Sequence, residues 1–329
     1  MWRRGAAMVA LVAACVLGAG PRAAAGEQAE VLLRIDDPRV VESSGLVTSR
    51  RHPGVLWTHN DSGDAARLFA VGRDGRVLAT LQLAGVEARD WEAMAMGRDD
   101  RGAPALFVGD IGDNQGVWPW VTVYRVAEPA RLRDATVRAE RYRLRYPDGP
   151  RDAEALLVDP RGNRLYVASK DEAGGSLYQA PATLRGDRVN LLRRVGRVPA
   201  LVTDGGFSPD GRTLVLRDYQ AAHVYAASGG RLATVPLPLQ PQGESITFSA
   251  DGRSLLAGSE GAGSEIWRVP LPATAMPATA TTRPPAAAPA TTPPPPRSRA
   301  GTPLLALAGV VALLAGTAGV ARSWRRRRA

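Results

Sequence analysis

One pattern of apolar and polar positions recurs along the chain. Three stretches of 17 residues align without a gap, and each has a short apolar run, a polar turn, a second apolar run and a polar end; they begin at Glu154, Thr203 and Glu244. Two further copies, which begin at Glu42 and Glu92, match each other and have a turn three residues longer. Short strands in a recurring unit of roughly 40–60 residues are typical of a β-propeller.

The strands within these repeats predict five blades, each a four-stranded antiparallel meander. In the third blade, we expect the outer strand to run over Val189–Val195. The fifth blade ends one strand short, after Glu265–Pro270, and the segment Glu30–Ile35 precedes the first repeat without another partner. We expect this segment to supply the missing strand, because closure by both ends of the chain removes open sheet edges. The predicted fold is therefore an all-β, five-bladed β-propeller closed by an N-terminal strand.

The two ends of the sequence differ in composition from the repeats. A basic start, an apolar stretch and an Ala-x-Ala site that ends at Ala25 predict a signal peptide. Near the other end, 19 residues without a charge are long enough to cross a bilayer, and the arginines after them should stay in the cytoplasm. The sequence thus predicts a single-pass cell-membrane protein with an extracellular propeller and a cytoplasmic C-terminus. Its parts are a signal peptide (1–25), a propeller ectodomain (26–270), a disordered Pro/Ala/Thr-rich stalk (271–302), a transmembrane helix (303–321) and a basic tail (322–329).

The net charge of +10 comes from the predicted export and anchor segments. Ten of the 42 Lys and Arg residues lie in the leader or near the membrane helix, and the 32 that remain equal the 32 acidic residues. The exported part is formally neutral, so we expect no nucleic-acid partner. The single cysteine, Cys15, lies in the leader, and the mature domain therefore has no disulfide. Two interpretations of Cys15 stay open, a lipidation site and an ordinary leader residue.

Each repeat begins its innermost strand with an acidic or hydroxyl residue, and the innermost strands of a propeller line a central channel. Carboxylates that converge there raise each other's pKa unless protons or a cation compensate. A hard divalent cation with oxygen ligands does so, and Ca²⁺ tolerates the loose geometry best. Ser44 rivals Glu42 in the first repeat, because the register can shift by two residues without changing faces. The candidate ligands are Glu42, Ser44, Glu92, Glu154, Thr203, Asp204 and Glu244.

A structural role for these acids is the alternative. In that interpretation, each carboxylate accepts backbone N–H groups from the neighbouring blade, or pairs with Arg89, Arg151 or Arg217, and so joins two blades. The sequence does not decide between a cation site and such inter-blade contacts.

A second set of polar residues follows the second strand of each repeat. These residues could form a ligand-binding rim, or they could be turn residues whose side chains bond their own backbone. The set is Asn60, Asp61, Asp110, Asp113, Asn114, Lys170, Arg217, Asp218 and Glu260, with Ser169 and Ser259 at the matching positions. The longest irregular loop, Gly109–Val121, carries Trp118 and Trp120, which either contact a ligand or cover the end of their own blade.

Several motifs resemble those of a family of exported actinobacterial β-propellers: ESSGL, LWTHNDSG, DWEAMA, GDIGDN, DAEALLVDP and QGESI. More distantly, the five-repeat plan is similar to that of calcium-activated nucleotidases (apyrases), and less closely to phytase-like propellers. In the nucleotidases, glutamates and serines of successive blades surround an axial calcium ion. The resemblance implies ligand roles here for Ser44, Glu92, Glu154, Glu244 and the Thr203–Asp204 position. The surrounding nucleotidase motifs do not match, so nucleotide hydrolysis does not follow from it.

Two functions remain open, since a propeller fold alone does not select one. The stalk and membrane helix favour a surface-tethered binding or scaffold module for an extracellular small molecule or protein. The histidines support this, because none of His52, His59 and His223 lies in a nucleophile elbow or a metal-binding pair.

The alternative function is a calcium-dependent phosphoesterase, similar to a nucleotidase or phytase. The axial ion would polarise the phosphoryl group, and Glu92 or Glu154 would orient the attacking water. Lys170 and Arg217 would contact the phosphate.

Overall fold

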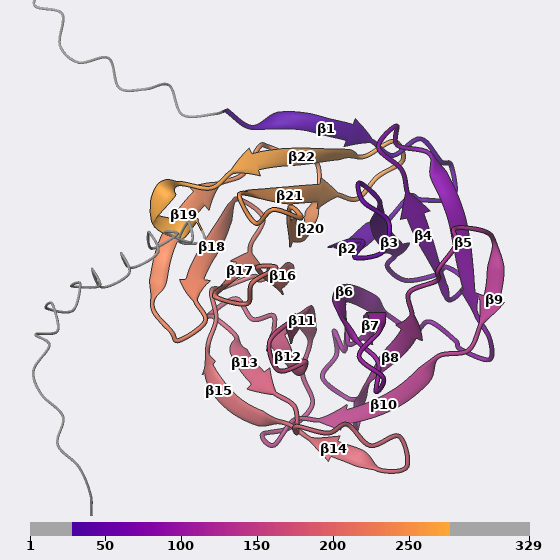
Figure 1. Cartoon of the computed structure of the whole chain (residues 1–329). Helices are drawn as coiled ribbons and strands as arrows, with labels where there is room; N and C mark the ends of the chain where they lie inside the picture. Colours follow the sequence, from indigo (N-terminus) through magenta and orange to yellow (C-terminus); the bar gives the residue numbers. More distant parts are fainter. Residues whose placement is uncertain (1–27, 277–329) are drawn as a thin grey trace, which may run out of the picture. The chain divides into compact units, whose positions relative to one another are not determined.

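The computed structural model describes residues 28–276. These residues fold into five mainly antiparallel sheets that are arranged in a ring (Figure 1). The innermost strand of each sheet contacts the innermost strands of the two sheets beside it, and the fifth contacts the first. In order around the ring they are β2 (Ser43–Thr48), β6 (Trp91–Arg98), β11 (Ala153–Asp159), β16 (Asp204–Phe207) and β20 (Gly243–Phe248). The predicted count of five blades is therefore confirmed.

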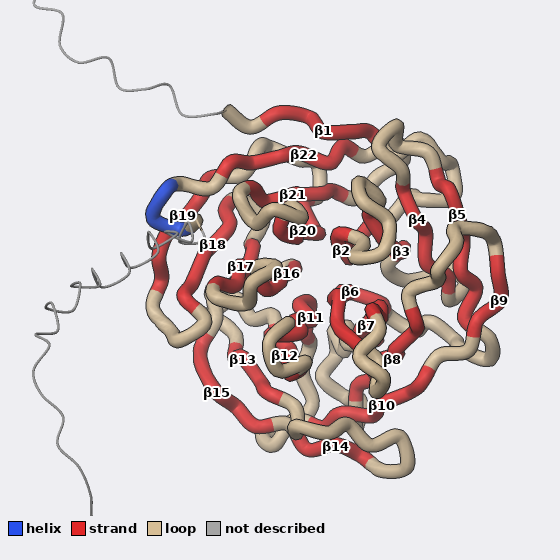
Figure 2. Tube along the Cα trace, viewed as in Figure 1, coloured by secondary structure: helices blue, strands red, loops and turns tan. Residues whose placement is uncertain are grey.

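Each blade is named below by its innermost strand, and Figure 2 shows its strands running outward from the axis. The outer strands are, for the β2 blade, β3 (Leu56–Asn60), β4 (Arg67–Val71) and β5 (Val77–Leu83); for the β6 blade, β7 (Pro104–Asp110), β8 (Val121–Ala127) and β10 (Glu140–Arg145); for the β11 blade, β12 (Arg164–Ser169), β13 (Ser176–Gln179) and β15 (Arg193–Arg197); for the β16 blade, β17 (Thr213–Arg217), β18 (Ala221–Ala226) and β19 (Arg231–Pro236); and for the β20 blade, β21 (Ser254–Ser259), β22 (Glu265–Pro270) and β1 (Glu30–Arg34).

The N-terminal strand closes the ring as predicted. β1 pairs antiparallel with β22, so that Glu30 lies opposite Arg268 and Arg34 lies opposite Glu265. Both cross-strand pairs have opposite charges and form ion pairs at the molecular surface, where each contributes little to stability. The larger contribution comes from Leu33, which is buried between the first and last blades.

The prediction of one outer strand over Val189–Val195 is wrong in part. Val189–Leu191 forms a separate strand, β14, that pairs parallel with β10 of the preceding blade, and only then does the chain enter β15. The side chain of Asn190 donates to the backbone oxygens of Arg143 (3.1 Å) and Arg185 (3.0 Å), and these bonds hold β14 against the preceding blade. A similar strand, β9 (Ala135–Val137), pairs parallel with β5. Both segments cover a sheet edge that would otherwise be open.

Hydrophobic side chains fill the space between blades. In the described part of the chain, five buried clusters lie at the five junctions between neighbouring blades. Trp57 and Trp91 are fully buried in the cluster between the β2 and β6 blades. Burial of one large apolar side chain stabilises a fold by about 1.5–3 kcal/mol, so these junctions can hold the ring together without disulfides.

The predicted signal peptide, transmembrane helix and basic tail lie outside the described residues and stay predictions. The predicted stalk lies there too, except for its first residues. Leu271 and Ala275 are buried in the cluster between the β16 and β20 blades, and Ala275 belongs to the short 3₁₀ helix η1 (Ala273–Ala275), which contacts β19. Between residues 28 and 276, no helix has the length and apolar character needed to cross a bilayer.

Candidate cation site on the propeller axis

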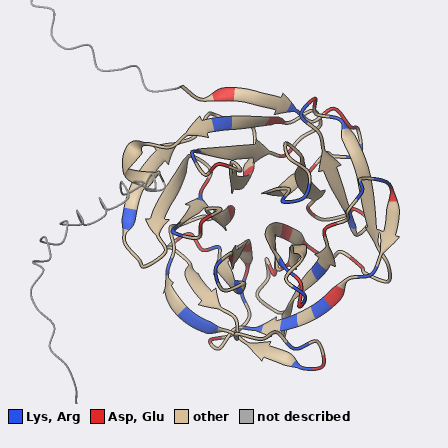
Figure 3. Cartoon of the chain, viewed as in Figure 1, with Lys and Arg blue, Asp and Glu red and all other residues tan. Residues whose placement is uncertain are grey.

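Acidic side chains from four of the five blades lie close together on the axis. Glu92 on β6, Glu154 on β11 and Glu244 on β20 are each about 95% buried. Glu42, Asp61 and Glu260 lie close enough for their charges to act on this group. Figure 3 shows acidic positions on the innermost strands, around the axis of the ring, and basic positions on outer strands such as β10 and β15.

Two further acids, Asp90 and Asp152, complete the cluster. Each precedes a buried glutamate by two residues, in the sequences Asp90-Trp91-Glu92 and Asp152-Ala153-Glu154. The register of the innermost strand shifts at each glutamate, between Trp91 and Ala93 and between Ala153 and Ala155, and one oxygen of each aspartate lies within 4.8 Å of one oxygen of the glutamate that follows it. These two aspartates are not among the predicted ligands. The signal was the repeated D-x-E pattern at the start of two innermost strands.

The carboxylates form two groups of three, within each of which one oxygen per residue lies within 4.8 Å of the others. Asp61, Asp90 and Glu92 form the first group, and Glu92, Asp152 and Glu154 form the second. Glu92 belongs to both. Oxygen atoms at such separations can ligate one hard divalent cation.

Burial and mutual repulsion make this cluster difficult to ionise. Burial, and then the charges of Glu154, Asp61 and Asp90, raise the pKa of Glu92 far above its usual range. Burial is also the main reason that the pKa of Asp61 rises to about 8 and that of Asp152 to about 7. The pKa of Glu244 rises to about 7 for the same reason. Without a compensating cation, the cluster therefore binds protons near neutral pH.

Several oxygens of the cluster have no hydrogen-bond donor. Glu244 Oε2, Asp61 Oδ1 and Asp152 Oδ1 are buried and have no partner among the described residues. The carboxyl group of Glu92 is about 95% buried, and the hydrogen bond that it makes is with another acid, Glu154, rather than with an N–H group. A buried acceptor without a donor costs about 1–3 kcal/mol, so the arrangement favours the binding of a cation.

Lys170 supplies the positive charge of the site. Its Nζ lies 2.7 Å from Glu154 Oε1 and 5.5 Å from the ring centre of Tyr219. Burial acts to lower the pKa of Lys170, but the carboxylate of Glu154 outweighs it and raises that pKa. The lysine is therefore charged, and it compensates one of the carboxylates.

The loop after β7 fits closely against the acids. A Cβ atom on Gly112 would lie 2.1 Å from Glu92 Oε1 and 2.7 Å from Asp90 Oδ2, so a side chain there would displace these carboxylates. Asn114 Nδ2 donates to Asp90 Oδ2 at 2.8 Å and orients that carboxylate. Asp113 accepts the backbone N–H groups of Val117 and Trp118 and shapes the loop. The GDIGDN motif thus positions two of the acids.

Ser44, Thr203 and Asp204, which the sequence predicted as cation ligands, instead join neighbouring blades. Ser44 Oγ donates to the backbone oxygen of Glu92 at 2.8 Å, and Thr203 Oγ1 donates to that of Glu244 at 2.9 Å. Asp204 is fully buried and accepts the N–H groups of Gly205 and Ile246, both at 2.7 Å. The side-chain oxygens of these three residues already bond backbone groups. We therefore leave the three residues out of the candidate site.

Arg217 also has a structural position rather than the predicted place at the rim. It is fully buried, and its Nη1 donates to the backbone oxygens of Ser245 (2.8 Å) and Gly258 (2.9 Å) in the β20 blade. Burial lowers its pKa to about 10. The other two arginines considered as partners of the axial glutamates pair elsewhere, Arg89 with Asp110 and Arg151 with Asp148.

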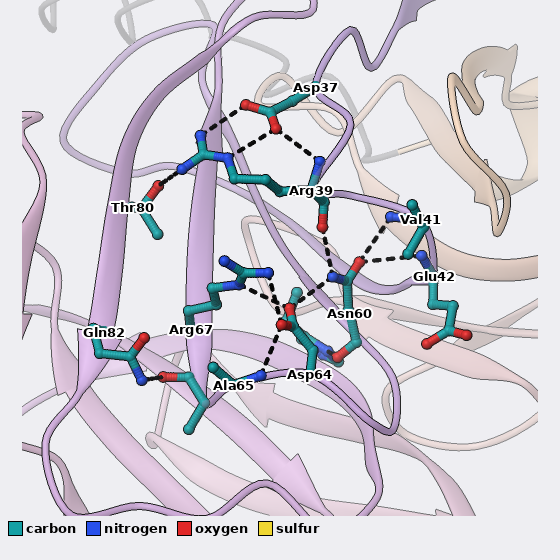
Figure 4. Close-up of polar contacts among 12 residues, drawn as sticks. Asp37, Arg39, Val41, Glu42, Asn60, Asp64, Ala65, Arg67, Thr80 and Gln82 are labelled. Atoms are coloured by element: carbon teal, nitrogen blue, oxygen red, sulfur yellow. Dashed lines mark hydrogen bonds and ion pairs between the residues drawn. The ribbon is translucent and has the colours of Figure 1, made fainter.

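The remaining predicted rim residues divide into two kinds. The residues at the ends of the second strands bond backbone groups of their own blades; Asn60, for example, accepts the N–H groups of Val41 and Glu42, just before β2, and donates to Asp64 Oδ2 (Figure 4). Asp110, Ser169, Asp218 and Ser259 likewise accept nearby backbone N–H groups. The residues one position later, Asp61, Lys170 and Glu260, belong to the axial cluster.

The two tryptophans of the long loop have different surroundings. Trp118 packs on the cluster between the β6 and β11 blades, and the guanidinium of Arg89 lies 3.7 Å from its ring centre. Trp118 therefore covers the end of its blade. Trp120 is 38% exposed and lies 5.5 Å from the guanidinium of Arg143.

The opposite end of the axis is apolar. The later residues of the innermost strands line a cavity of about 490 Å³, which includes Met94, Val158, Phe207, Ile246 and Phe248. The acids are thus confined to the end where the innermost strands begin, and a cation bound there would meet ligands that approach from that end.

No protein-family model and no curated protein matches the sequence. Among solved structures, a gluconolactonase from Xanthomonas campestris is similar with a TM-score of 0.41 and 16% identity, over 66% of this chain and 69% of that chain. A luciferin-regenerating enzyme is similar with a TM-score of 0.41 and 13% identity, over 70% of this chain and 78% of that chain. At these levels we transfer neither activity to this chain.

Proposed function

We propose that this chain is an exported propeller, tethered to the cell membrane by its C-terminal helix, that binds a divalent cation, Ca²⁺, at the acidic end of its axis. The cation would hold the blades together at the axis and present open coordination positions to an extracellular ligand. A small molecule or a protein segment with anionic oxygens fits such a surface, because those atoms are the ligands that Ca²⁺ prefers.

The environment of Glu92 is the observation that carries this proposal. The carboxyl group is buried between acids of the neighbouring blades, and it shares a hydrogen bond with one of them, Glu154. A purely structural glutamate would accept N–H groups, as Asp204 does. A buried acid that is surrounded by other acids instead calls for a cation or a proton.

The described histidines favour binding over hydrolysis. His59 is fully buried, with Nδ1 bonded to the backbone oxygen of Asn60 and a pKa that burial lowers to about 4. His223 pairs with Asp218 at 2.8 Å, and His52 Nε2 bonds the backbone oxygen of Pro129. The hydroxyl that His223 Nδ1 meets at 3.5 Å, that of Thr234, lies on the outer strand β19, away from the acids of the innermost strands.

The phosphoesterase alternative retains one of its two predicted phosphate contacts. Lys170 lies beside the acids, where it could neutralise a phosphate bound to the cation. Arg217 cannot reach such a ligand, because it is fully buried and donates to backbone oxygens. We therefore place the binding function first.

Two assays on the full-length protein separate these functions. Thermal melting in EDTA and in millimolar CaCl₂ tests for the cation, and hydrolysis of p-nitrophenyl phosphate in CaCl₂ tests for phosphoesterase activity. We expect a higher melting temperature in CaCl₂ and no turnover. Turnover that Glu154→Gln abolishes would establish the enzyme instead, and equal melting temperatures in the two buffers would refute the cation site.

A further inference from the structure

We infer that the axial cluster binds two divalent cations, which share Glu92 as a bridging carboxylate. The first lies between Asp61, Asp90 and Glu92, and the second between Glu92, Asp152 and Glu154. This inference rests on the proposed function, but it makes a separate statement about the number of ions and about which residues bind each one.

The spacing of the oxygens supports two positions rather than one. Protein oxygens bind Ca²⁺ at about 2.4 Å, so two ligands of the same ion can be at most about 4.8 Å apart. The five acids fall into two groups that meet this limit, and Glu92 is the residue common to both. One ion placed in either group satisfies three of the five carboxylates and leaves the other two without a cation.

The charge of the cluster leads to the same number. The five carboxylates of the two groups and the ammonium group of Lys170 have a formal charge of −4. One divalent cation neutralises half of this charge, whereas two neutralise it and leave only the charges of the nearby Glu42, Glu244 and Glu260. Buried charge that remains uncompensated is costly, whereas a carboxylate that bridges two ions reduces their repulsion. Two-metal sites of this kind have ions about 3.5–4 Å apart.

The surroundings of Glu92 suit a carboxylate that binds both cations. Glu92 is about 95% buried, and its neighbours on both sides are acids, one oxygen of each within 4.8 Å. Gly112 leaves room for Glu92 Oε1 on the side of Asp90. Each group supplies ligands from three residues, fewer than the 6–8 oxygens that Ca²⁺ takes. The remaining positions are open to water or to the oxygens of an anionic ligand.

The test is the number of Ca²⁺ ions bound by the full-length protein. After treatment with EDTA and dialysis, the protein is titrated with CaCl₂ at pH 8 by isothermal titration calorimetry, and bound calcium is counted by mass spectrometry. We expect two ions in the unchanged protein, one in Asp61→Asn, one in Asp152→Asn and none in Glu92→Gln. Glu172→Gln, an exposed acid outside the cluster, is the matched control and should bind two.

The outcomes distinguish this inference from the proposed function. One ion in the unchanged protein would overturn the shared site but leave the cation site, and no ion would overturn both. Two ions in both Asp61→Asn and Asp152→Asn would overturn the assignment of residues. Melting curves of each variant, recorded in the same buffers, show that lost binding does not come from unfolding.

Discussion

Lys170, the single lysine of the chain, lies with its Nζ 2.7 Å from Glu154 Oε1 at the acidic end of the axis. All other basic side chains are arginines, whose planar guanidinium groups are larger and are better suited to bidentate pairing. The compact ammonium group compensates one acid and leaves the others free. The ion pair therefore limits the repulsion in the cluster.

The stability of the cation-free protein should fall as the pH rises from 6.5 to 8. The pKa of Asp61 is raised to about 8 and those of Asp152 and Glu244 to about 7, whereas the unfolded chain has already released these protons. The folded state thus binds more protons than the unfolded state, and its free energy of unfolding decreases with pH. Thermal melting in EDTA at pH 6.5, 7.2 and 8.0 measures this effect. A melting temperature that rises over this range would contradict it.

Asp204→Asn should destabilise the protein and leave cation binding intact. The new amide group cannot accept one of the two N–H groups that Asp204 binds, and an unpaired buried donor costs about 1–3 kcal/mol. Urea unfolding measures the loss, and calorimetry measures Ca²⁺ binding. Loss of calcium binding in a variant that remains folded would return Asp204 to the cation site.

Gly112→Ala should weaken Ca²⁺ binding, because the new Cβ would lie 2.1 Å from Glu92 Oε1 and displace that carboxylate. Overpacking of this kind costs about 1–3 kcal/mol. Gly162→Ala is the control, since a Cβ there has no heavy atom within 4 Å. Calcium titrations of both variants measure the effect, and equal affinities would show that the loop does not position the acid.

Leu33→Ala should destabilise the protein by about 2–4 kcal/mol, because Leu33 fills the junction closed by β1. Val31→Ala, on the same strand but 44% exposed, should change the stability much less. Urea unfolding of the two variants tests whether the N-terminal strand is part of the core. Similar small losses in both would contradict the closure.

The repeat pattern was sufficient to predict the fold, because strands, turns and blade closure follow from alternation and from the need to cover sheet edges. The pairing of β14 with the preceding blade was not predictable in this way, since it depends on a contact between Asn190 and Arg143. The similarity to calcium-activated nucleotidases, which was drawn from the five-repeat plan, stays a prediction.

The candidate site was predictable in part. Glu92, Glu154 and Glu244 converge as the register of the innermost strands required. Asp204 occupies a similar place in the pattern but accepts two backbone N–H groups. Whether a carboxylate bonds a neighbouring blade or faces the axis depends on contacts that the local sequence does not contain.

The most direct test of the cation site is the stability of Glu92→Gln relative to the unchanged protein at pH 8, in EDTA and in millimolar CaCl₂. In EDTA at pH 8, the folded unchanged protein holds a proton on Glu92 that the unfolded chain releases, and this lowers its free energy of unfolding. We therefore expect the glutamine variant to be more stable by at least about 1 kcal/mol, which corresponds to roughly 2–4 °C in melting temperature. In CaCl₂, we expect the order to reverse, because only the glutamate binds the cation. The same order in both buffers would contradict an axial cation site.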